Sequence, residues 1–97
     1  MKPILRIRMP DGSQWDIPTI VVARHRARAY AHEFGNNPDR SLKEDTTPLF
    51  NENPDAIADW ASNQMNWKEV KDFAVCTKNA PSVDFQDGWV NGEKVLI

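Results

Sequence analysis

Hydrophobic and polar residues alternate along residues 5–9, where leucine, isoleucine and methionine are separated by two arginines. This period of two is typical of a β-strand with one buried face. Residues 10–13 read Pro-Asp-Gly-Ser, which favours a turn, and residues 14–17 form a second short strand-like segment. The sequence therefore predicts an N-terminal β-hairpin that ends at Pro18, because proline brings no N–H to a strand partner.

From Thr19 onwards the apolar period changes to that of an α-helix. Six residues fall on one stripe at helical spacing, namely Ile20, Ala23, Ala27, Tyr30, Ala31 and Phe34. Pro18 suits the first turn of such a helix, and Gly35 suits its C-terminal stop. We expect one long amphipathic helix over 19–34, packed closely against a neighbour because three of the stripe positions are alanine.

Residues 36–53 combine two prolines with a dense mixture of polar side chains. The apolar residues in this segment are Leu42, Leu49 and Phe50. This composition predicts a long polar loop that Leu49 and Phe50 anchor to the core. Long loops in compact domains are often functional.

Two helix starts follow in close succession. Asn53, Pro54 and Asp55 give the order of a cap, a first-turn proline and an acid at the positive end of the helix dipole. The residues from Asn66 to Glu69 match a capping box. We therefore expect two short helices that meet at a corner. The second helix would bury a stripe made of Val70, Phe73, Ala74 and Thr77.

The C-terminal part of the chain returns to the pattern of strands. Apolar and polar residues alternate over 83–86, and Asn91 and Gly92 form the pair that type I′ hairpin turns prefer. Strands and helices thus come in separate blocks, which is typical of α+β folds. We expect one domain over 1–97, with an N-terminal β-hairpin, one long amphipathic helix, two short helices and C-terminal short strands that complete a small antiparallel sheet.

Composition fits one folded domain, since 40% of the 97 residues are hydrophobic and 27% are charged. This length excludes a multi-domain enzyme, and no stretch approaches the roughly 20 apolar residues of a membrane span. Cys76 is the one cysteine, so an internal disulfide is excluded. Charges interrupt the N-terminal apolar run too often for a signal peptide. We therefore expect a protein of the reducing bacterial cytoplasm.

Charge is divided unevenly between the two parts of the chain. Residues 1–32 hold six lysines and arginines against two acids, whereas residues 33–97 hold six against twelve. This asymmetry indicates either a basic surface for an anionic partner or two complementary layers of one fold. The candidate residues for an anionic ligand are Arg6, Arg8, Arg24 and Arg28.

The reactive side chains do not form a recognisable catalytic, cofactor or metal site. His25 and His32 would lie about 10 Å apart along a helix, too far to share one zinc ion. Both are off the apolar stripe, so we expect solvated surface histidines. Asp55 and Asp59 are explained by the helix dipole. Cys76 would lie near the C-terminal end of a short helix, where the dipole does not activate a thiol. Glycine-rich phosphate loops and catalytic signature motifs are absent from the sequence.

The polar face of the predicted long helix is the better candidate for binding. Arg24 and Arg28 are four residues apart, and like charges at this spacing cost a few tenths of a kcal/mol. The candidate partner-binding residues are Arg24, His25, Arg28, His32 and Trp67. The alternatives are a solvated helix face whose arginines pair with acids, and a tryptophan that covers the corner between two helices.

Five segments together resemble a group of small uncharacterised proteins of tailed bacteriophages and prophages. They are 11–18, 23–27, 59–63, 66–71 and 88–94, and the resemblance does not extend over 36–53. The group has no established activity, so the resemblance implies no role for any residue. It implies a phage accessory protein made in a bacterial cytoplasm, of the size commonly used to bind and redirect a host protein.

We therefore expect a small non-enzymatic interaction protein that binds a host or phage protein through the helix 19–34 and the segment 36–53. The alternative is a nucleic-acid-binding module that uses the basic N-terminal part, and a further alternative is a minor structural component of the virion. We expect no cofactor and no membrane partner. A second copy of the chain is a further candidate partner, at the strand edge formed by residues 94–97.

Overall fold

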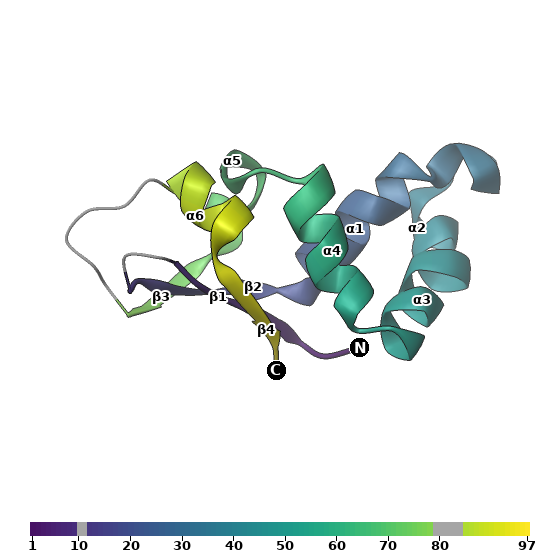
Figure 1. The fold of residues 1–97 in the computed structure, drawn as a ribbon. Coiled ribbons are helices and arrows are strands. Elements are labelled where there is room, and N and C mark those ends of the chain that lie inside the picture. The colour runs from purple at the N-terminus through teal and green to yellow at the C-terminus, as the bar shows by residue number, and fades with distance from the viewer. Residues whose placement is uncertain (10–11, 79–84) are drawn as a thin grey trace.

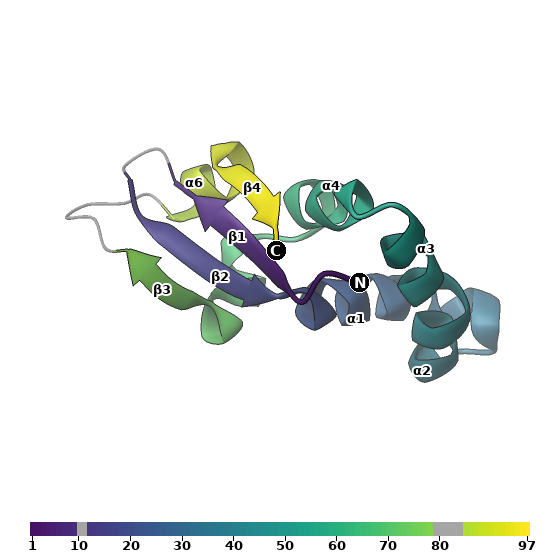
Figure 2. The same cartoon turned by 90° about the horizontal axis from the view of Figure 1, so that it is seen from below.

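The computed structural model describes residues 1–9, 12–78 and 85–97 (Figure 1). The four strands in these residues form one antiparallel sheet in the order β3-β2-β1-β4. Their bounds are Ile4–Arg8 for β1, Gln14–Pro18 for β2, Val75–Lys78 for β3 and Glu93–Leu96 for β4. Helices lie over one face of the sheet, and the view from below shows the strands with no helix in front of them (Figure 2). The predicted α+β class with a small antiparallel sheet is confirmed.

The N-terminal hairpin forms as the alternation predicts. β1 and β2 pair in antiparallel register, with Ile7 opposite Trp15. Leu5 and Ile7 are fully buried, whereas Arg6 between them points to the open face of the sheet. Gly12 leaves the turn with a φ of +93°, which favours glycine. The other two expected turn residues, 10 and 11, lie outside the described part of the chain.

The helix expected over 19–34 is shorter than predicted. α1 spans Thr19–Ala29, and a tighter 3-10 helix, η1, spans Ala31–Phe34. Between them Tyr30 has a φ of −102° and a ψ of 5°, which interrupts the α-helical hydrogen bonding, while its ring packs 5.9 Å from the ring of Trp60. Gly35 ends η1 in the left-handed conformation, as predicted. The buried side of α1 consists of Thr19, Val22, Ala23 and Ala27.

The prediction of a long polar loop over 36–53 is wrong. The segment contains α2 (Pro38–Ser41), a π-helical turn η2 (Leu42–Thr46) and α3 (Thr47–Glu52). The Asn37 side chain accepts a hydrogen bond from the Arg40 N–H, and Pro38 occupies the first turn. This is the same order of cap and proline that predicted the helix start near residue 54, so the local signal for a helix was present.

Two polar side chains of this segment, Asp45 and Thr46, are hydrogen-bonded by an arginine of α1. Arg26 Nη1 donates to Asp45 Oδ2 at 2.8 Å and to Thr46 Oγ1 at 2.9 Å. Thr46 is fully buried as a result, and Phe50 is buried beside it in the chain's apolar core. Arg26 of α1 thus helps to hold this mostly polar helical segment against the rest of the chain.

The two short helices meet at the predicted corner. α4 spans Asp55–Gln64 and α5 spans Trp67–Val70. The capping box is confirmed, since the Glu69 N–H donates to Asn66 Oδ1 and the Asn66 N–H donates to Glu69 Oε1, both at 3.2 Å. At α4, by contrast, Asn53 makes no side-chain cap, and its carbonyl accepts from the Ala56 N–H instead.

The second short helix ends earlier than expected. A 3-10 turn, η3, covers Lys71–Phe73, and the chain then enters β3. The expected buried stripe over 70–77 is wrong at Phe73, which is 53% exposed, and at Thr77, which is also exposed. Val70 is buried, and Ala74 is half-buried against the core. β-branched residues at 75 and 77 favour the strand, which pairs with β2.

The predicted C-terminal hairpin around Asn91 and Gly92 is wrong. A helix, α6, spans Phe85–Asn91, and β4 follows directly and pairs with β1. Residues 83 and 84 of the expected strand over 83–86 lie outside the described residues. Gly92 closes the helix by donating its N–H to the Gly88 carbonyl at 2.7 Å, and a Cβ at this position would lie 2.4 Å from that oxygen. The glycine is needed for close approach, not for a type I′ turn.

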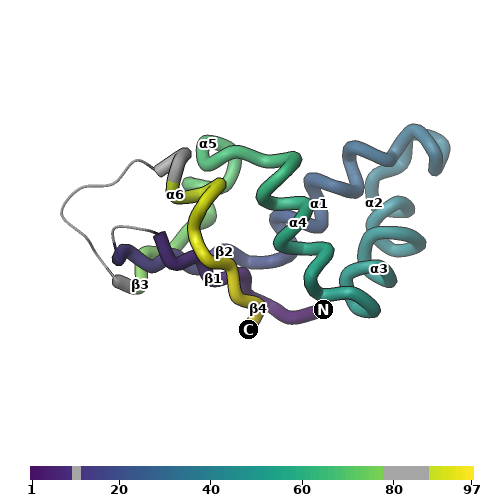
Figure 3. The backbone as a smooth tube through the Cα atoms, viewed as in Figure 1, coloured from purple at the N-terminus to yellow at the C-terminus, as the bar shows by residue number. Residues whose placement is uncertain are grey.

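Tryptophans hold the helices against the sheet. Trp89 on α6 is fully buried, and its Nε1 donates to the carbonyls of Ala61 at 3.1 Å and Met65 at 3.0 Å. Trp67 packs edge-on against Trp15, with ring centroids 5.2 Å apart. The molecule measures 46 × 23 × 18 Å, with the sheet at one end and α2 and α3 at the other (Figure 3). α1 joins the two ends.

Candidate functional site

Two arginines occupy the exposed side of α1. Arg24 and Arg28 are one helical turn apart and both are exposed. Neither forms an ion pair within the described residues, whereas Arg6, Arg26 and Arg40 each pair with an acid at 2.7 to 2.8 Å. We call Arg24 and Arg28 together the arginine ridge.

A hollow lies on one side of the arginine ridge, with a volume of about 160 Å³. We call it the first hollow, and its lining residues are Val21, Arg24, His25, Arg28, Met65, Glu69 and Phe73. A cavity of about 150 Å³ accepts a molecule the size of benzene. The first hollow therefore has room for one large apolar side chain between an exposed phenylalanine and two guanidinium groups.

His25 forms one wall of the first hollow and is fixed from both sides. Its Nδ1 accepts a hydrogen bond from Trp60 Nε1 at 3.0 Å, and its Nε2 lies 2.8 Å from Glu69 Oε2. An accepting Nδ1 puts the ring proton on Nε2, which then donates to the carboxylate. The expectation of a solvated surface histidine is wrong, because the side chain is only 22% exposed and joins α1 to α4 and α5.

A second hollow, of about 120 Å³, lies against the same ridge. Its lining residues are Arg24, Ala27, Arg28, Pro38, Asp39 and Leu42. Both arginines thus belong to both hollows. The chain places a positively charged divide between two small depressions that each have apolar walls.

The other predicted anionic-ligand residues lie elsewhere. On the open face of the sheet, Arg6 donates from Nε and Nη2 to the two carboxylate oxygens of Asp16 at 2.8 and 2.9 Å. This guanidinium holds the pKa of Asp16 below its usual value. Arg8 is exposed, and its Nη1 lies 4.0 Å from Glu93 Oε2. The four arginines therefore form two separate groups.

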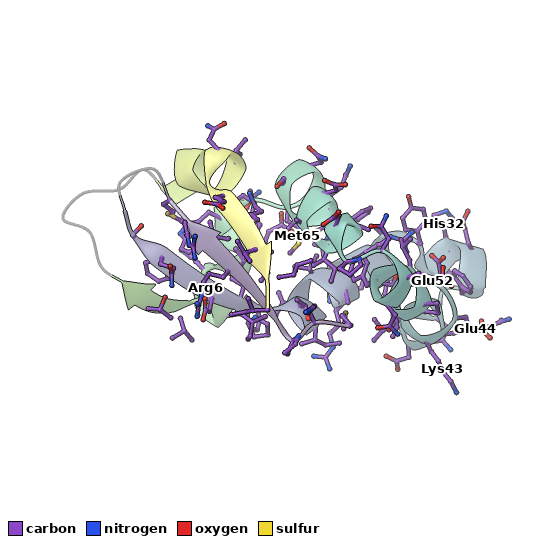
Figure 4. The ribbon with its side chains drawn as sticks, turned by 60° about the horizontal axis from the view of Figure 1, so that its bottom comes forward. Arg6, His32, Lys43, Glu44, Glu52 and Met65 are labelled. Carbon is purple, nitrogen blue, oxygen red and sulfur yellow. The ribbon has the colours of Figure 1, made fainter. Side chains whose placement is uncertain are left out.

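His32 is exposed on η1 and is not among the lining residues of either hollow. Figure 4 shows it near the helical end of the molecule, well away from Arg6 on the sheet. The predicted partner-binding set is thus only partly brought together. Arg24 and Arg28 share both hollows, and His25 lines the first.

Trp67 does not provide an exposed anchor for a partner. Its exposed fraction is 8%, and its ring lies between those of Trp15 and Trp89, at centroid distances of 5.2 and 6.2 Å. Of the two readings of this tryptophan, the one in which it covers the corner between helices fits the burial. Trp67 is the first residue of α5, directly after the cap residue Asn66.

The sequence did not predict that three apolar residues, Phe73, Pro38 and Leu42, lie beside the arginine ridge. Phe73 was assigned to a buried helical stripe, but it lies in a 3-10 turn at the surface. Pro38 and Leu42 were assigned to a loop, but they belong to α2 and η2 and line the second hollow. The cap pattern at residues 37–39 was the available signal for α2, whose Pro38 lines the second hollow. The sequence offered no comparable signal for Phe73.

The remaining reactive residues stay scattered. Asp55 lies in the first turn of α4, and Cys76 lies on β3 and not at a helix end as expected. Among residues 1–9, 12–78 and 85–97, no three His, Cys, Asp or Glu side chains are placed to hold a metal ion together. Within the same residues, no helix has both the length and the apolar character that crossing a membrane requires.

The free edge of β4 is the expected place for a second copy of the chain. Lys94 lies opposite Ile7, on the helix side of the sheet, and its Nζ donates to the Trp89 carbonyl at the end of α6. Burial lowers the pKa of this amine. An inward-pointing lysine is a device that disfavours pairing between sheet edges. Association with a second copy stays a prediction.

Comparisons of the chain with protein-family models, with curated proteins and with solved structures find no match. The resemblance to small phage proteins therefore stays a prediction. The arginine ridge and its two hollows are the features from which a function is proposed.

Proposed function

We propose that the protein is a non-enzymatic interaction module that binds an acidic surface of a partner protein through the arginine ridge. One observation carries this proposal. Arg24 and Arg28 are exposed and lack an acidic partner among the described residues, although acids are frequent in the chain and pair with Arg6, Arg26 and Arg40. Like charges one turn apart cost a helix a few tenths of a kcal/mol unless something compensates.

The surroundings of the ridge suit a protein partner. Arginine and aromatic side chains are enriched at protein interfaces, and a guanidinium binds a carboxylate through two parallel hydrogen bonds. Here the arginines stand beside an exposed phenylalanine, Phe73, and small apolar depressions. This combination of charge and apolar surface supports recognition of side chains.

Nucleic-acid binding is the weaker proposal. It requires Arg6, Arg8, Arg24 and Arg28 to contact the phosphate backbone of the same nucleic acid. Arg6, however, is paired with Asp16 on the open face of the sheet. The net charge of −2 also gives little attraction for phosphate chains. A role as a minor virion component would use the same ridge against a phage protein.

The resemblance to phage proteins supplies the proposed setting. In that setting the partner is a host or phage protein, and binding takes place in the bacterial cytoplasm. A standard protein interface takes about 800 Å² of each partner, which the chain's surface of 5679 Å² can provide.

A charge-reversal experiment tests the proposal. The variant Arg24→Glu/Arg28→Glu is compared with wild type and with Lys2→Glu/Lys43→Glu, which reverses two exposed lysines and changes the net charge equally. Each is used at micromolar concentration to capture cross-linked partners from a bacterial lysate. We expect wild type and the lysine variant to retain the same protein and the arginine variant to lose it. Equal capture by all three, or no captured protein, would reject the proposal.

A gel shift with duplex and single-stranded DNA at low salt tests the weaker proposal in parallel. We expect no shift. A shift that disappears steeply between low and physiological salt would favour nucleic-acid binding instead.

A further inference from the structure

We infer that the arginine ridge recognises an extended peptide segment with an acidic centre and one apolar side chain on each side of it. This inference rests on the proposed function and specifies its partner. It follows from the way in which the ridge and the two hollows share residues.

Charge sets the centre of the segment. Arg24 and Arg28 line the first hollow and the second hollow alike, so a ligand that enters both hollows must cross the two guanidinium groups. Side chains of aspartate and glutamate satisfy such groups with paired, charge-assisted hydrogen bonds. An acidic residue is therefore expected where the segment crosses α1.

Size and lining set the two flanking residues. The first hollow, of about 160 Å³, is walled on its apolar side by Val21, Met65 and Phe73, which suits an aromatic side chain or leucine. The second, of about 120 Å³, is walled by Ala27, Pro38 and Leu42 and suits a smaller aliphatic side chain. Each hollow takes one side chain, so two anchors are expected.

Carboxylates within the hollows restrict the acids to the centre. The first hollow contains Glu69 and the second contains Asp39. An acidic side chain inserted into either hollow would face a like charge with its own water removed, which is costly. A continuous row of phosphates meets the same obstacle on both sides of the ridge. The arrangement therefore favours a peptide with alternating character over a nucleic acid.

Spacing gives the length of the segment. A helix with its side chains is about 10–12 Å across, and an extended chain advances about 3.3 Å per residue. Side chains two residues apart in an extended chain point to the same face. A peptide that lies across α1 thus places its two apolar anchors about four residues apart, with an acid midway between them on the same face. The whole recognised segment is about five residues long.

A selection from a random peptide display library tests the inference. The immobilised full chain is used as wild type, as Lys2→Glu/Lys43→Glu, as Arg24→Glu/Arg28→Glu and as Phe73→Ser. Circular dichroism and thermal unfolding verify that each variant is folded, which is expected because all the altered side chains are exposed. The strongest peptide is then synthesised with a fluorescent label, and its affinity is measured by anisotropy.

We expect wild type and the lysine variant to enrich peptides with one or two central acids and an apolar residue on each side. Arg24→Glu/Arg28→Glu should weaken the labelled peptide roughly tenfold or more, because it replaces attraction with repulsion. Phe73→Ser should also weaken it, by roughly fivefold or more, and in the selection it should remove the preference for a large apolar residue at one end only.

Three results would overturn the inference. They are enrichment of peptides with acids but no apolar flanks, enrichment that Phe73→Ser leaves unchanged, and no enrichment at all. If the lysate experiment still captures a partner through Arg24 and Arg28, any of these results rejects the segment but leaves the proposed function standing. Equal capture by wild type and the arginine variant in that experiment, or no captured protein, rejects the proposed function itself.

Discussion

The inner and outer faces of α1 use the same residue type for different purposes. On the inner face, Arg26 is only 13% exposed, binds Asp45 and Thr46, and lies with its guanidinium carbon 4.6 Å from the centre of the Tyr30 ring. On the outer face, Arg24 and Arg28 are exposed and unpaired with acids in the described residues. Arg26 holds the fold together, whereas its neighbours are left for solvent or a partner.

Helical period explains the difference. Residues two positions apart on an α-helix point about 200° away from each other. Arg26 follows Val22 by one turn and precedes Tyr30 by one turn, so it belongs to a row that begins in the core. Arg24 and Arg28 form the row on the opposite side. Position along the period, and not residue type, separates a structural arginine from a free one.

Shortening Val22, a fully buried side chain on the inner face of α1, should have the largest effect on stability. Val22→Ala removes two methyl groups from a fully buried site, which we expect to lower the free energy of unfolding by roughly 1.5–3 kcal/mol. Val21→Ala is the matched control, because Val21 lies beside it at the half-exposed wall of the first hollow. Urea unfolding of the two variants measures the difference. Equal losses would contradict the assignment of the two faces.

Loss of the structural arginine should come next. Arg26→Gln removes a charge-assisted hydrogen bond to Asp45 and the partner of the buried Thr46 hydroxyl. We expect it to cost about 1.5 kcal/mol, because the Asp45 side chain is 37% exposed. Arg40→Gln is the control, since its pair with Glu44 is exposed and of the i,i+4 kind, worth roughly 0.3–0.5 kcal/mol. If the two variants unfold at the same urea concentration, Arg26 is not the link between α1 and residues 38–52.

Sequence patterns predicted the elements that are held by local interactions. The hairpin of residues 4–18 follows from alternation, and the capping box at Asn66 follows from spacing alone. Both depend on residues that are near each other in the chain, which is why a local pattern suffices.

Elements that depend on distant partners were not predicted. Residues 38–52 are mostly polar, and Arg26 of α1, which is distant in the sequence, binds Asp45 among them. α6 is held by Trp89, whose indole N–H donates to the carbonyls of Ala61 and Met65. The candidate site was found in part, because Arg24 and Arg28 follow from the helical period. The hollows beside them depend on how α2, η2 and η3 pack against α1, which no local pattern contains.

The ion pair between Arg6 and Asp16 is a second structural arginine pair, on the sheet instead of α1. We expect it to make a smaller, pH-dependent contribution to the free energy of unfolding. Arg6 holds the pKa of Asp16 below its usual value, so the folded chain takes up this proton less readily than the unfolded chain. The stabilisation is fully present above about pH 4 and is lost as pH falls through the lowered pKa. We expect the difference in unfolding free energy between wild type and Asp16→Asn to be constant over roughly pH 5 to 8 and to shrink in acid. A difference that grows in acid would show that Asp16 is not stabilised by Arg6.

The smallest expected effect on stability belongs to the ridge and has the opposite sign. Arg24→Gln/Arg28→Gln removes the repulsion between two cations one turn apart, so at low ionic strength the variant should be more stable than wild type by roughly 0.2–0.5 kcal/mol. The gain should fade as added salt shortens the Debye length to about 3 Å near 1 M. Thermal unfolding at low and high salt measures both. A loss of stability in the variant would mean that these arginines serve the fold as Arg26 does. A gain in stability that disappears at high salt would mean that Arg24 and Arg28 destabilise the folded chain through their repulsion. Residues retained to bind a partner would behave in this way.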